Sequence, residues 1–246
     1  MSNGLFCASD FCEKYKTKEI QNDLNRRGIS RLCHMTQIDN LVEILTNKTG
    51  ILADDFIEGE KLHRNDPDRL DGKTDFISMS IQFPNVWYYR YRKNSRSEMS
   101  DWAVIFVDTD ICKRSNTLFS PVNAAKANGA YLGTGVSRLM DIFDETVAGR
   151  SRTEKMLSSC PTDDQAEIMI HYRIPVEYIK GIAFETMEVV NMFIELANRY
   201  SIEYPKLYLA PELFATSLSN KIRKGVIPSE ILVKEESGLW QKDMCS

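Results

Sequence analysis

The apolar run Trp-Ala-Val-Ile-Phe-Val at residues 102–107 constrains the fold more strongly than any other segment. Six consecutive apolar residues, three of them β-branched, are typical of a strand that is buried on both faces. Such a strand requires a sheet with further layers packed against it. The chain can supply those layers, because 43 % of its 246 residues are hydrophobic and a chain of this length often forms one domain.

Shorter patterns predict more strands around this run. Residues 76–81 alternate, with Ile77, Met79 and Ile81 on one face and two serines on the other. Runs rich in apolar and β-branched residues also predict strands at 31–35, 167–172 and 179–185.

Helices are predicted where apolar residues recur at helical spacing. Four of them follow the i, i+3, i+4, i+7 pattern: Ile38, Leu41, Val42 and Leu45. A segment resembling a capping box at 36–39 precedes them, and Gly50 is the expected stop. Further helices are predicted at 9–27, 139–147 and 187–200. Because strands and helices do not alternate strictly, the predicted fold class is α+β, in a single domain over residues 1–246.

Composition excludes several classes of protein. A net charge of −4 argues against coating of nucleic acid by bulk charge, although it permits a local basic groove. The six cysteines form no CxxC pair, so no zinc or other metal site is expected, and their thiols should be reduced. No apolar run approaches about 18 residues and no signal-peptide core is present, which favours a cytoplasmic protein without a membrane span. P-loop, Rossmann, α/β-hydrolase and zincin motifs are also missing.

The first candidate site combines a strand with the helix that follows it. His34 and Thr36 point to the same side of the predicted strand, and Asn40 lies in the first turn of the helix. An imidazole, a hydroxyl and an amide around one cavity suit a ribose or an amide ligand. The alternative is that His34 is a core histidine and Thr36 a helix cap.

The second candidate is Glu167, the first residue of a predicted strand. A carboxylate at the lip of a strand, beside an apolar patch, is well placed to act as a catalytic acid or base. A metal-dependent nuclease would need a lysine two residues later, where this chain has Met169. The alternative is an edge-strand glutamate in water.

The segment 86–96 holds four aromatic residues and four positive charges with no acid. Aromatic rings interleaved with arginine and lysine suit a single-stranded nucleic acid or a dinucleotide. The alternative is an amphipathic helix whose aromatic side chains pack inward.

Residues 53–75 are charged and turn-rich, and they read as a long functional loop. Within this loop, Arg69 follows His63 by six residues. An arginine in an ordered loop could clamp a diphosphate, whereas the simpler alternative is a solvated charge.

In their order along the chain, these segments resemble the DarT family of nucleic-acid ADP-ribosyltransferase toxins. Residues 34–45 are similar to the family's opening HxT…NLxxIL motif, and residues 63–70 to its HxxIKxRxL stretch. Asn-Ala-Ala at 123–125 resembles its [HN]AA segment. Residues 165–179 are similar to the QAE…VP…I block that carries the catalytic glutamate.

The resemblance implies an ADP-ribosyltransferase-like split β-sandwich core at about residues 30–185, with flanking helices and a C-terminal extension at 186–246. It implies NAD as co-substrate, no metal, and Glu167 and Arg69 as catalytic residues. The expected NAD contacts are His34, Thr36, Asn40, Arg69, Ser78 and Tyr88. The expected nucleic-acid contacts are Arg90, Arg92, Lys93, Asn123 and Tyr131.

The function implied is transfer of ADP-ribose from NAD onto a base of single-stranded DNA. The protein would act as a toxin of a toxin–antitoxin or phage-defence system, with a cognate antitoxin such as a macrodomain hydrolase. The alternatives are the same reaction on RNA, a protein mono-ADP-ribosyltransferase, and a non-catalytic nucleic-acid-binding module. The base also stays open, because residues 77–85 depart from the thymidine-modifying pattern and look more like the branch associated with guanine or RNA.

Overall fold

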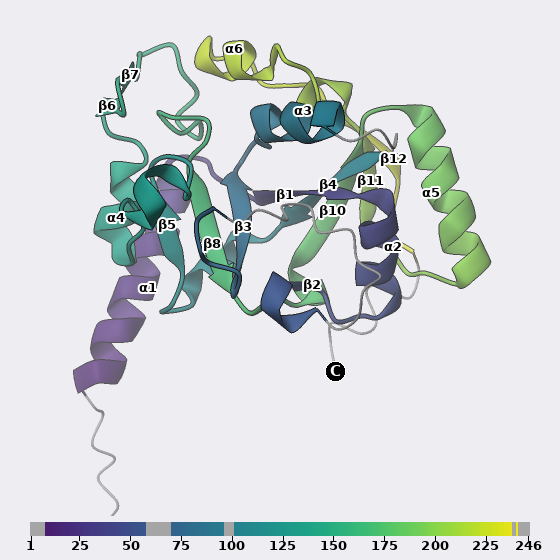
Figure 1. Ribbon diagram of the computed structural model, residues 1–246, viewed down its shortest axis with the longest axis horizontal. Helices are drawn as coiled ribbons and strands as arrows, with labels where there is room; N and C mark the ends of the chain where they lie inside the picture. Colours follow the sequence, from purple (N-terminus) through teal and green to yellow (C-terminus); the bar gives the residue numbers. More distant parts are fainter. Residues whose placement is uncertain (1–7, 58–69, 96–100, 238–239, 241–246) are drawn as a thin grey trace, which may run out of the picture.

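This computed structural model describes residues 8–57, 70–95, 101–237 and 240 of the chain. A central β-sheet forms the middle layer of the fold. Its strands are β1 (Leu32–Gln37), β3 (Phe76–Ile81), β4 (Trp102–Val107), β5 (Leu118–Ser120), β8 (Glu167–His171), β10 (Ile179–Phe184), β11 (Lys206–Leu209) and β12 (Ile231–Lys234). These eight strands lie in the order β12-β11-β10-β4-β1-β3-β8-β5 (Figure 1). Two small antiparallel pairs flank the sheet: β2 (Ile51–Leu52) with β9 (Arg173–Ile174), and β6 (Thr146–Val147) with β7 (Arg150–Ser151).

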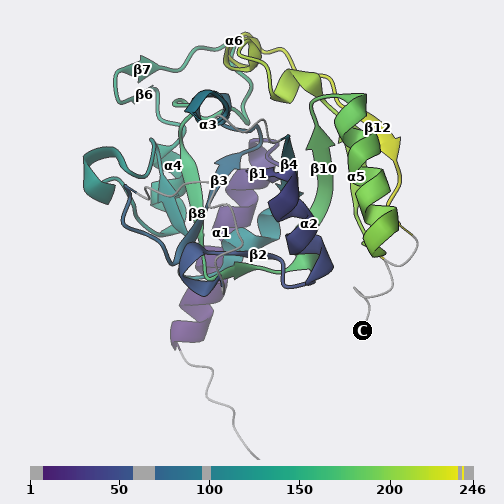
Figure 2. The ribbon, with the colours of Figure 1, turned by 45° about the vertical axis from the view of Figure 1, so that its right-hand side comes forward.

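The helices cover both faces of this sheet (Figures 1 and 2). They are α1 (Ala8–Arg26), α2 (Ile38–Thr46), α3 (Val86–Ser95), α4 (Gly135–Asp141), α5 (Met187–Tyr200) and α6 (Leu218–Arg223). Short 3-10 helices are η1 (Asp54–Phe56), η2 (Thr109–Lys113), η3 (Lys126–Gly129), η4 (Val176–Tyr178) and η5 (Pro211–Leu213). Helices α1, α2, α4 and α5 share one apolar core, and α3 and α6 contribute to a second. None of the helices within the described ranges is long and apolar enough to cross a membrane.

Strand β4 confirms the burial expected of residues 102–107, because all six side chains are at most 4 % exposed. Ala103, Ile105 and Val107 belong to the first core, and the alternate residues Trp102, Val104 and Phe106 belong to the second. The strand is therefore covered on both faces, as its unbroken apolar sequence requires.

The sheet opens between β1 and β3. Strand β1 pairs with β4 along its whole length, but it pairs with β3 only at Leu32↔Ile81 and Cys33↔Ser80. Strand β3 instead continues alongside β8, from Phe76↔His171 to Ser80↔Glu167. The two halves of the sheet therefore separate at His34, which gives the split that the fold class implied.

The predicted α+β class is confirmed, and three predicted elements match exactly: β3, β4 and α5. The helix predicted at 139–147 is wrong, because α4 ends at Asp141 and residues 146–147 form β6. Leu139, Ile142 and Phe143 have helical spacing and are buried, but the last two reach the core from a turn. Strands β11 and β12 extend the same sheet, so the segment after residue 186 is continuous with the central layer.

Candidate active site

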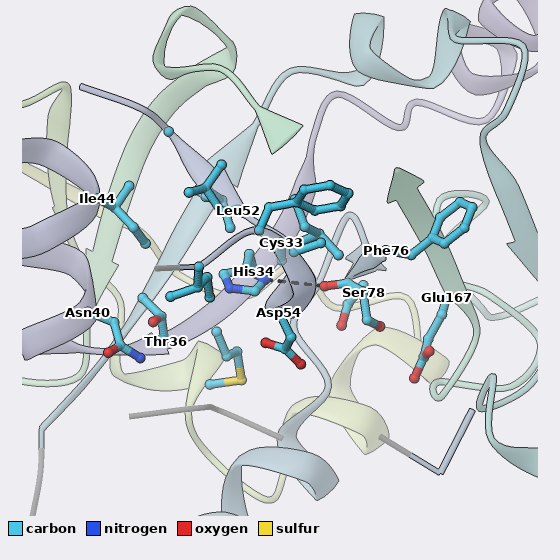
Figure 3. A pocket seen from close by; sticks show the side chains of 18 of the residues that line it. Cys33, His34, Thr36, Asn40, Ile44, Leu52, Asp54, Phe76, Ser78 and Glu167 are labelled. Carbon is cyan, nitrogen blue, oxygen red and sulfur yellow. Dashed lines mark hydrogen bonds between the residues drawn. The ribbon is translucent and has the colours of Figure 1, made fainter. Parts of the chain in front are cut away.

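A pocket of about 520 Å³ lies where β1 and β3 separate. This volume falls in the usual range for small-molecule sites. The pocket is lined by seven of the predicted site residues: His34, Thr36, Asn40, Ser78, Tyr88, Asn123 and Glu167. Figure 3 shows Asn40 and Thr36 towards one end and Glu167 at the other, with His34 and Ser78 between them. The pocket thus joins the two halves of the split sheet.

His34 bridges the opening between the two strands. Its Nδ1 atom lies 3.2 Å from the backbone oxygen of Ser78 in β3. Because a carbonyl oxygen can only accept a hydrogen bond, Nδ1 is the donor in this contact. The contact fixes the orientation of the imidazole at the mouth of the split.

Thr36 and Asn40 lie on the α2 side of the pocket. Thr36 is fully buried and Asn40 is 7 % exposed. Helix α2 has Gln37 as its N-cap residue, without a side-chain cap bond, so the capping box expected at 36–39 is wrong. The helix ends at Thr46, and Gly50, the expected stop, instead lines the pocket. Thr36 is therefore a pocket residue rather than a cap.

Glu167 is held by the turn that contains the Asn-Ala-Ala segment. The Asn123 Nδ2 amide donates to Oε1 of Glu167 at 3.1 Å, and the Ala124 N–H donates to Oε2 at 3.4 Å. Asn123 is itself oriented, because its Oδ1 accepts from the Ala125 N–H at 3.0 Å. The carboxylate is therefore oriented in the pocket before any ligand arrives. Asn123, predicted as a nucleic-acid contact, is placed here as a partner of Glu167.

Sequence reasoning missed the apolar wall of the pocket. Those apolar residues include Leu52, Phe56, Ile57 and Phe76, and Asp54 adds a carboxylate to the lining. Phe56 packs edge-to-face on Tyr172, with ring centroids 4.6 Å apart. The available signal was the charged segment 53–75, whose first residues form part of this wall.

The basic residues of α3 lie in different environments. Arg90 is exposed, whereas Arg92 is only 5 % exposed and its guanidinium lies 5.9 Å from the centre of the Tyr88 ring. Arg92, predicted as a nucleic-acid contact, thus packs against a neighbouring residue of its own helix, and that role stays a prediction. The Lys93 ammonium donates to the Tyr89 hydroxyl at 2.6 Å and to Glu185 at 3.1 Å. Burial raises the pKa of Tyr89 to about 12, so its hydroxyl stays neutral.

Four of the predicted site residues that the structure describes lie outside the pocket lining: Arg90, Arg92, Lys93 and Tyr131. Tyr131 is 37 % exposed. Arg69 lies outside the described residues, so its assignment stays a prediction.

Asp164, three residues before Glu167, connects the segment that leads into β8 to three other elements of the fold. Its carboxylate accepts from Trp87 Nε1 of α3 at 3.0 Å and from Arg150 Nη1 of β7 at 2.7 Å, and also from the Ser219 hydroxyl of α6. Burial raises the pKa of Asp164, but the hydrogen bonds from Ser219 and Trp87, together with the Arg150 charge, lower it below its usual value. One carboxylate thus ties three elements to the chain entering β8.

We expect Asp164→Asn to lower the free energy of unfolding at pH 7 by about 2 kcal/mol, through loss of charge-assisted hydrogen bonds. A depressed pKa stabilises the fold above about pH 4, and this stabilisation is lost as the pH falls through the folded-state value. The difference from wild type should therefore shrink between neutral pH and about pH 3. Urea unfolding at several pH values measures it, with the exposed Asp101→Asn as control. A difference that is constant with pH would contradict the electrostatic origin.

Within the described part of the chain, no group of three or more histidine, cysteine, aspartate or glutamate side chains could hold a metal ion. The groups that the pocket offers for chemistry are the oriented carboxylate, the imidazole and the polar side chains on the α2 side.

Comparisons with known proteins connect the chain with one family and its fold. A family model described as ssDNA thymidine ADP-ribosyltransferase, DarT, matches residues 33–215. The structure of Thermus sp. 2.9 DarT in complex with NAD+ is 13 % identical, with a TM-score of 0.53, over 76 % of this chain and 98 % of that chain. The same Thermus protein in complex with ADP-ribosylated ssDNA is 13 % identical, with a TM-score of 0.54, over 76 % and 97 % of the two chains. Thermosipho africanus DarTG in complex with ADP-ribose is 18 % identical, with a TM-score of 0.53, over 75 % and 51 %. These likenesses show a shared fold. No curated protein sequence matches the chain.

Proposed function

The chain belongs to the DarT family of NAD-dependent ADP-ribosyltransferases, and we propose that its pocket binds NAD and delivers ADP-ribose to a base of single-stranded DNA. The observation that carries the proposal is the meeting, in one pocket, of His34, Thr36 and Asn40 with the oriented Glu167. The first three suit the hydroxyl and amide groups of a nicotinamide riboside. The carboxylate suits the positive charge that develops on the ribose.

The proposed reaction breaks the bond between nicotinamide and C1′ of the ribose. Nicotinamide leaves with the electron pair of that bond, and the ribose acquires oxocarbenium character that Glu167 stabilises electrostatically. A nitrogen of the base then forms the new bond to C1′, and its proton passes to the Glu167 carboxylate and on to water. Asn123 holds the carboxylate in place during these steps, while Ser78 and Tyr88 supply further contacts to NAD.

Single-stranded DNA is the substrate favoured by the family description and by the Thermus complex with ADP-ribosylated ssDNA. The attacking nitrogen of a base is masked in a stacked duplex, which supports an unpaired target. The same reaction on RNA is the rival, since a 2′-hydroxyl contact could come from almost any polar side chain.

We further propose that the protein acts as a toxin in the cytoplasm and is countered by a cognate antitoxin such as a macrodomain hydrolase. The family membership and the structural likeness to Thermosipho africanus DarTG support the toxin role. The cysteines Cys33, Cys112 and Cys160 are free and buried, which is typical of a reducing compartment.

The test is to incubate the purified protein with NAD and, separately, with single-stranded DNA, RNA and a protein extract. We expect a mass gain of one ADP-ribose unit on the DNA, with release of one nicotinamide for each modification. Oligonucleotides that lack one base in turn identify the acceptor, thymine or guanine. Labelling of RNA alone or of protein alone would contradict the proposed substrate.

A further inference from the structure

The outward face of α3 carries two large aromatic side chains that the core does not use. Trp87 is 46 % exposed and Tyr91 is 63 % exposed, and Arg90 between them is also exposed. Positions i, i+3 and i+4 share one face of a helix, so the three side chains form one surface stripe. Exposed aromatic residues in such a group mark a binding surface more often than scattered single ones do.

The other faces of α3 explain why this stripe points outward. Val86 and Tyr89 are buried in the second core, where Tyr89 packs edge-to-face on Trp102 and Phe214. Tyr88 lines the pocket. The helix thus presents its third side, with Trp87 and Tyr91, to solvent beside the pocket.

Two contacts fix the stripe relative to the active site. The Asn85 side-chain oxygen caps α3 by accepting from the N–H groups of Trp87 and Tyr88, both at 3.1 Å, and Asn85 itself lines the pocket. The Trp87 indole donates to Asp164, which leads into the strand of Glu167. The ring is therefore oriented while nearly half of it stays open to solvent.

The positive charge of α3 indicates which kind of ligand suits the stripe of Trp87, Arg90 and Tyr91. Residues 86–95 contain three cations and no acid, in a chain whose net charge is −4. Lys93 is paired with Glu185, so the exposed cation of the stripe is Arg90. Aromatic faces beside an arginine suit a single-stranded nucleic acid, whose bases stack and whose phosphates are negative.

We propose that Trp87, Arg90 and Tyr91 form a second subsite, outside the NAD pocket, for nucleotides that flank the modified base. Neighbouring bases stack on Trp87 and Tyr91, and a phosphate lies against Arg90. The inference rests on the proposed function, because flanking nucleotides exist only if the acceptor is a nucleic acid strand. Helix α3 then has two roles, because Tyr88 lines the NAD pocket and the stripe binds the nucleic-acid strand.

The test compares two acceptors that contain the target base, a mononucleotide that has no neighbours and a strand of roughly a dozen nucleotides. We expect Tyr91→Ala and Trp87→Ala each to raise KM for the long strand about tenfold, with kcat and the mononucleotide kinetics little changed. Tyr91→Phe and Trp87→Phe should stay close to wild type, because they keep a stacking ring. Trp87→Phe also loses the indole bond to Asp164, so it separates stacking from that structural contact. Arg90→Gln should flatten the salt dependence of binding by about one phosphate contact.

The matched control is Tyr200→Ala in α5, which removes another exposed tyrosine, 57 % exposed, without touching α3. If wild type labels both acceptors and the stripe variants match it on both, the subsite is wrong while the proposed function stands. Equal losses on the two acceptors would also contradict it, because a flanking subsite cannot act on an acceptor that has no flanking nucleotides. A wild-type protein that labels neither acceptor would overturn the proposed function and this subsite together.

Discussion

Glu167→Gln is expected to slow ADP-ribose transfer by about 100-fold or more, because it removes the negative charge that stabilises the developing oxocarbenium ion. Glutamine has nearly the same shape and can still accept the hydrogen bond that Asn123 donates to Oε1, although its NH2 group cannot accept the longer bond from the Ala124 N–H. Asn123 should therefore keep its contact with residue 167. The measurement is the initial rate of modified single-stranded DNA at saturating NAD, together with the Kd for NAD.

The affinity for NAD separates the loss of chemistry from the loss of the pocket. We expect the Kd of Glu167→Gln to stay within a few-fold of wild type, since binding relies on several other groups. Glu195→Gln, an exposed carboxylate on α5, is the matched control and should react at the wild-type rate. A Glu167→Gln protein that transfers ADP-ribose as fast as wild type would show that another group carries the reaction.

The strongest sequence signals predicted the sheet well. The alternating run at 76–81 and the unbroken apolar run at 102–107 became β3 and β4 with the same bounds, because each pattern fits only one kind of burial. The amphipathic pattern at 187–200 likewise became α5. The apolar pattern of each of these segments fits only one type of secondary structure.

The split between β1 and β3 could not be predicted from such patterns. Burial of Leu32 and exposure of His34 to a pocket depend on where two strands stop pairing, which is a property of the whole sheet. Seven residues of the pocket were nevertheless predicted, His34, Thr36, Asn40 and Glu167 from polar side chains within apolar segments and the others with the help of the family resemblance. The apolar wall, including Leu52 and Phe56, was missed because its residues resemble ordinary core residues.

Helix α3 shows a second limit. Its sequence alternates aromatic and basic residues, so no apolar stripe marks the buried face. The structure buries Tyr89 and Arg92 and exposes Trp87 and Tyr91, so aromatic and basic residues are each divided between the two sides. The helix with inward-packing aromatic side chains is thus confirmed in part, and nucleic-acid binding by the exposed side chains stays a prediction.

Gly50→Ala is expected to give the largest loss of stability among single-methyl changes at the pocket. Gly50 has a φ of +79°, and a Cβ atom there would lie 2.0 Å from the backbone oxygen of Ile174. A backbone oxygen cannot rotate away, so β2 would have to separate from β9, with which it pairs at Ile51↔Ile174. We expect the free energy of unfolding to fall by about 3 kcal/mol or more, from left-handed strain and overpacking together.

Gly28→Ala isolates the conformational part of that loss. Gly28 has a similar φ of +71°, but nothing lies within 4 Å of the position that its Cβ would take. We expect this variant to lose only about 1 kcal/mol, and to keep the wild-type KM for NAD. Gly50→Ala should instead raise that KM, because Gly50 lines the pocket and β2 carries its neighbouring wall. Urea unfolding and NAD kinetics on both variants measure the difference. Equal losses of stability would mean that strain alone explains Gly50, and that the close approach to Ile174 does not shape the pocket.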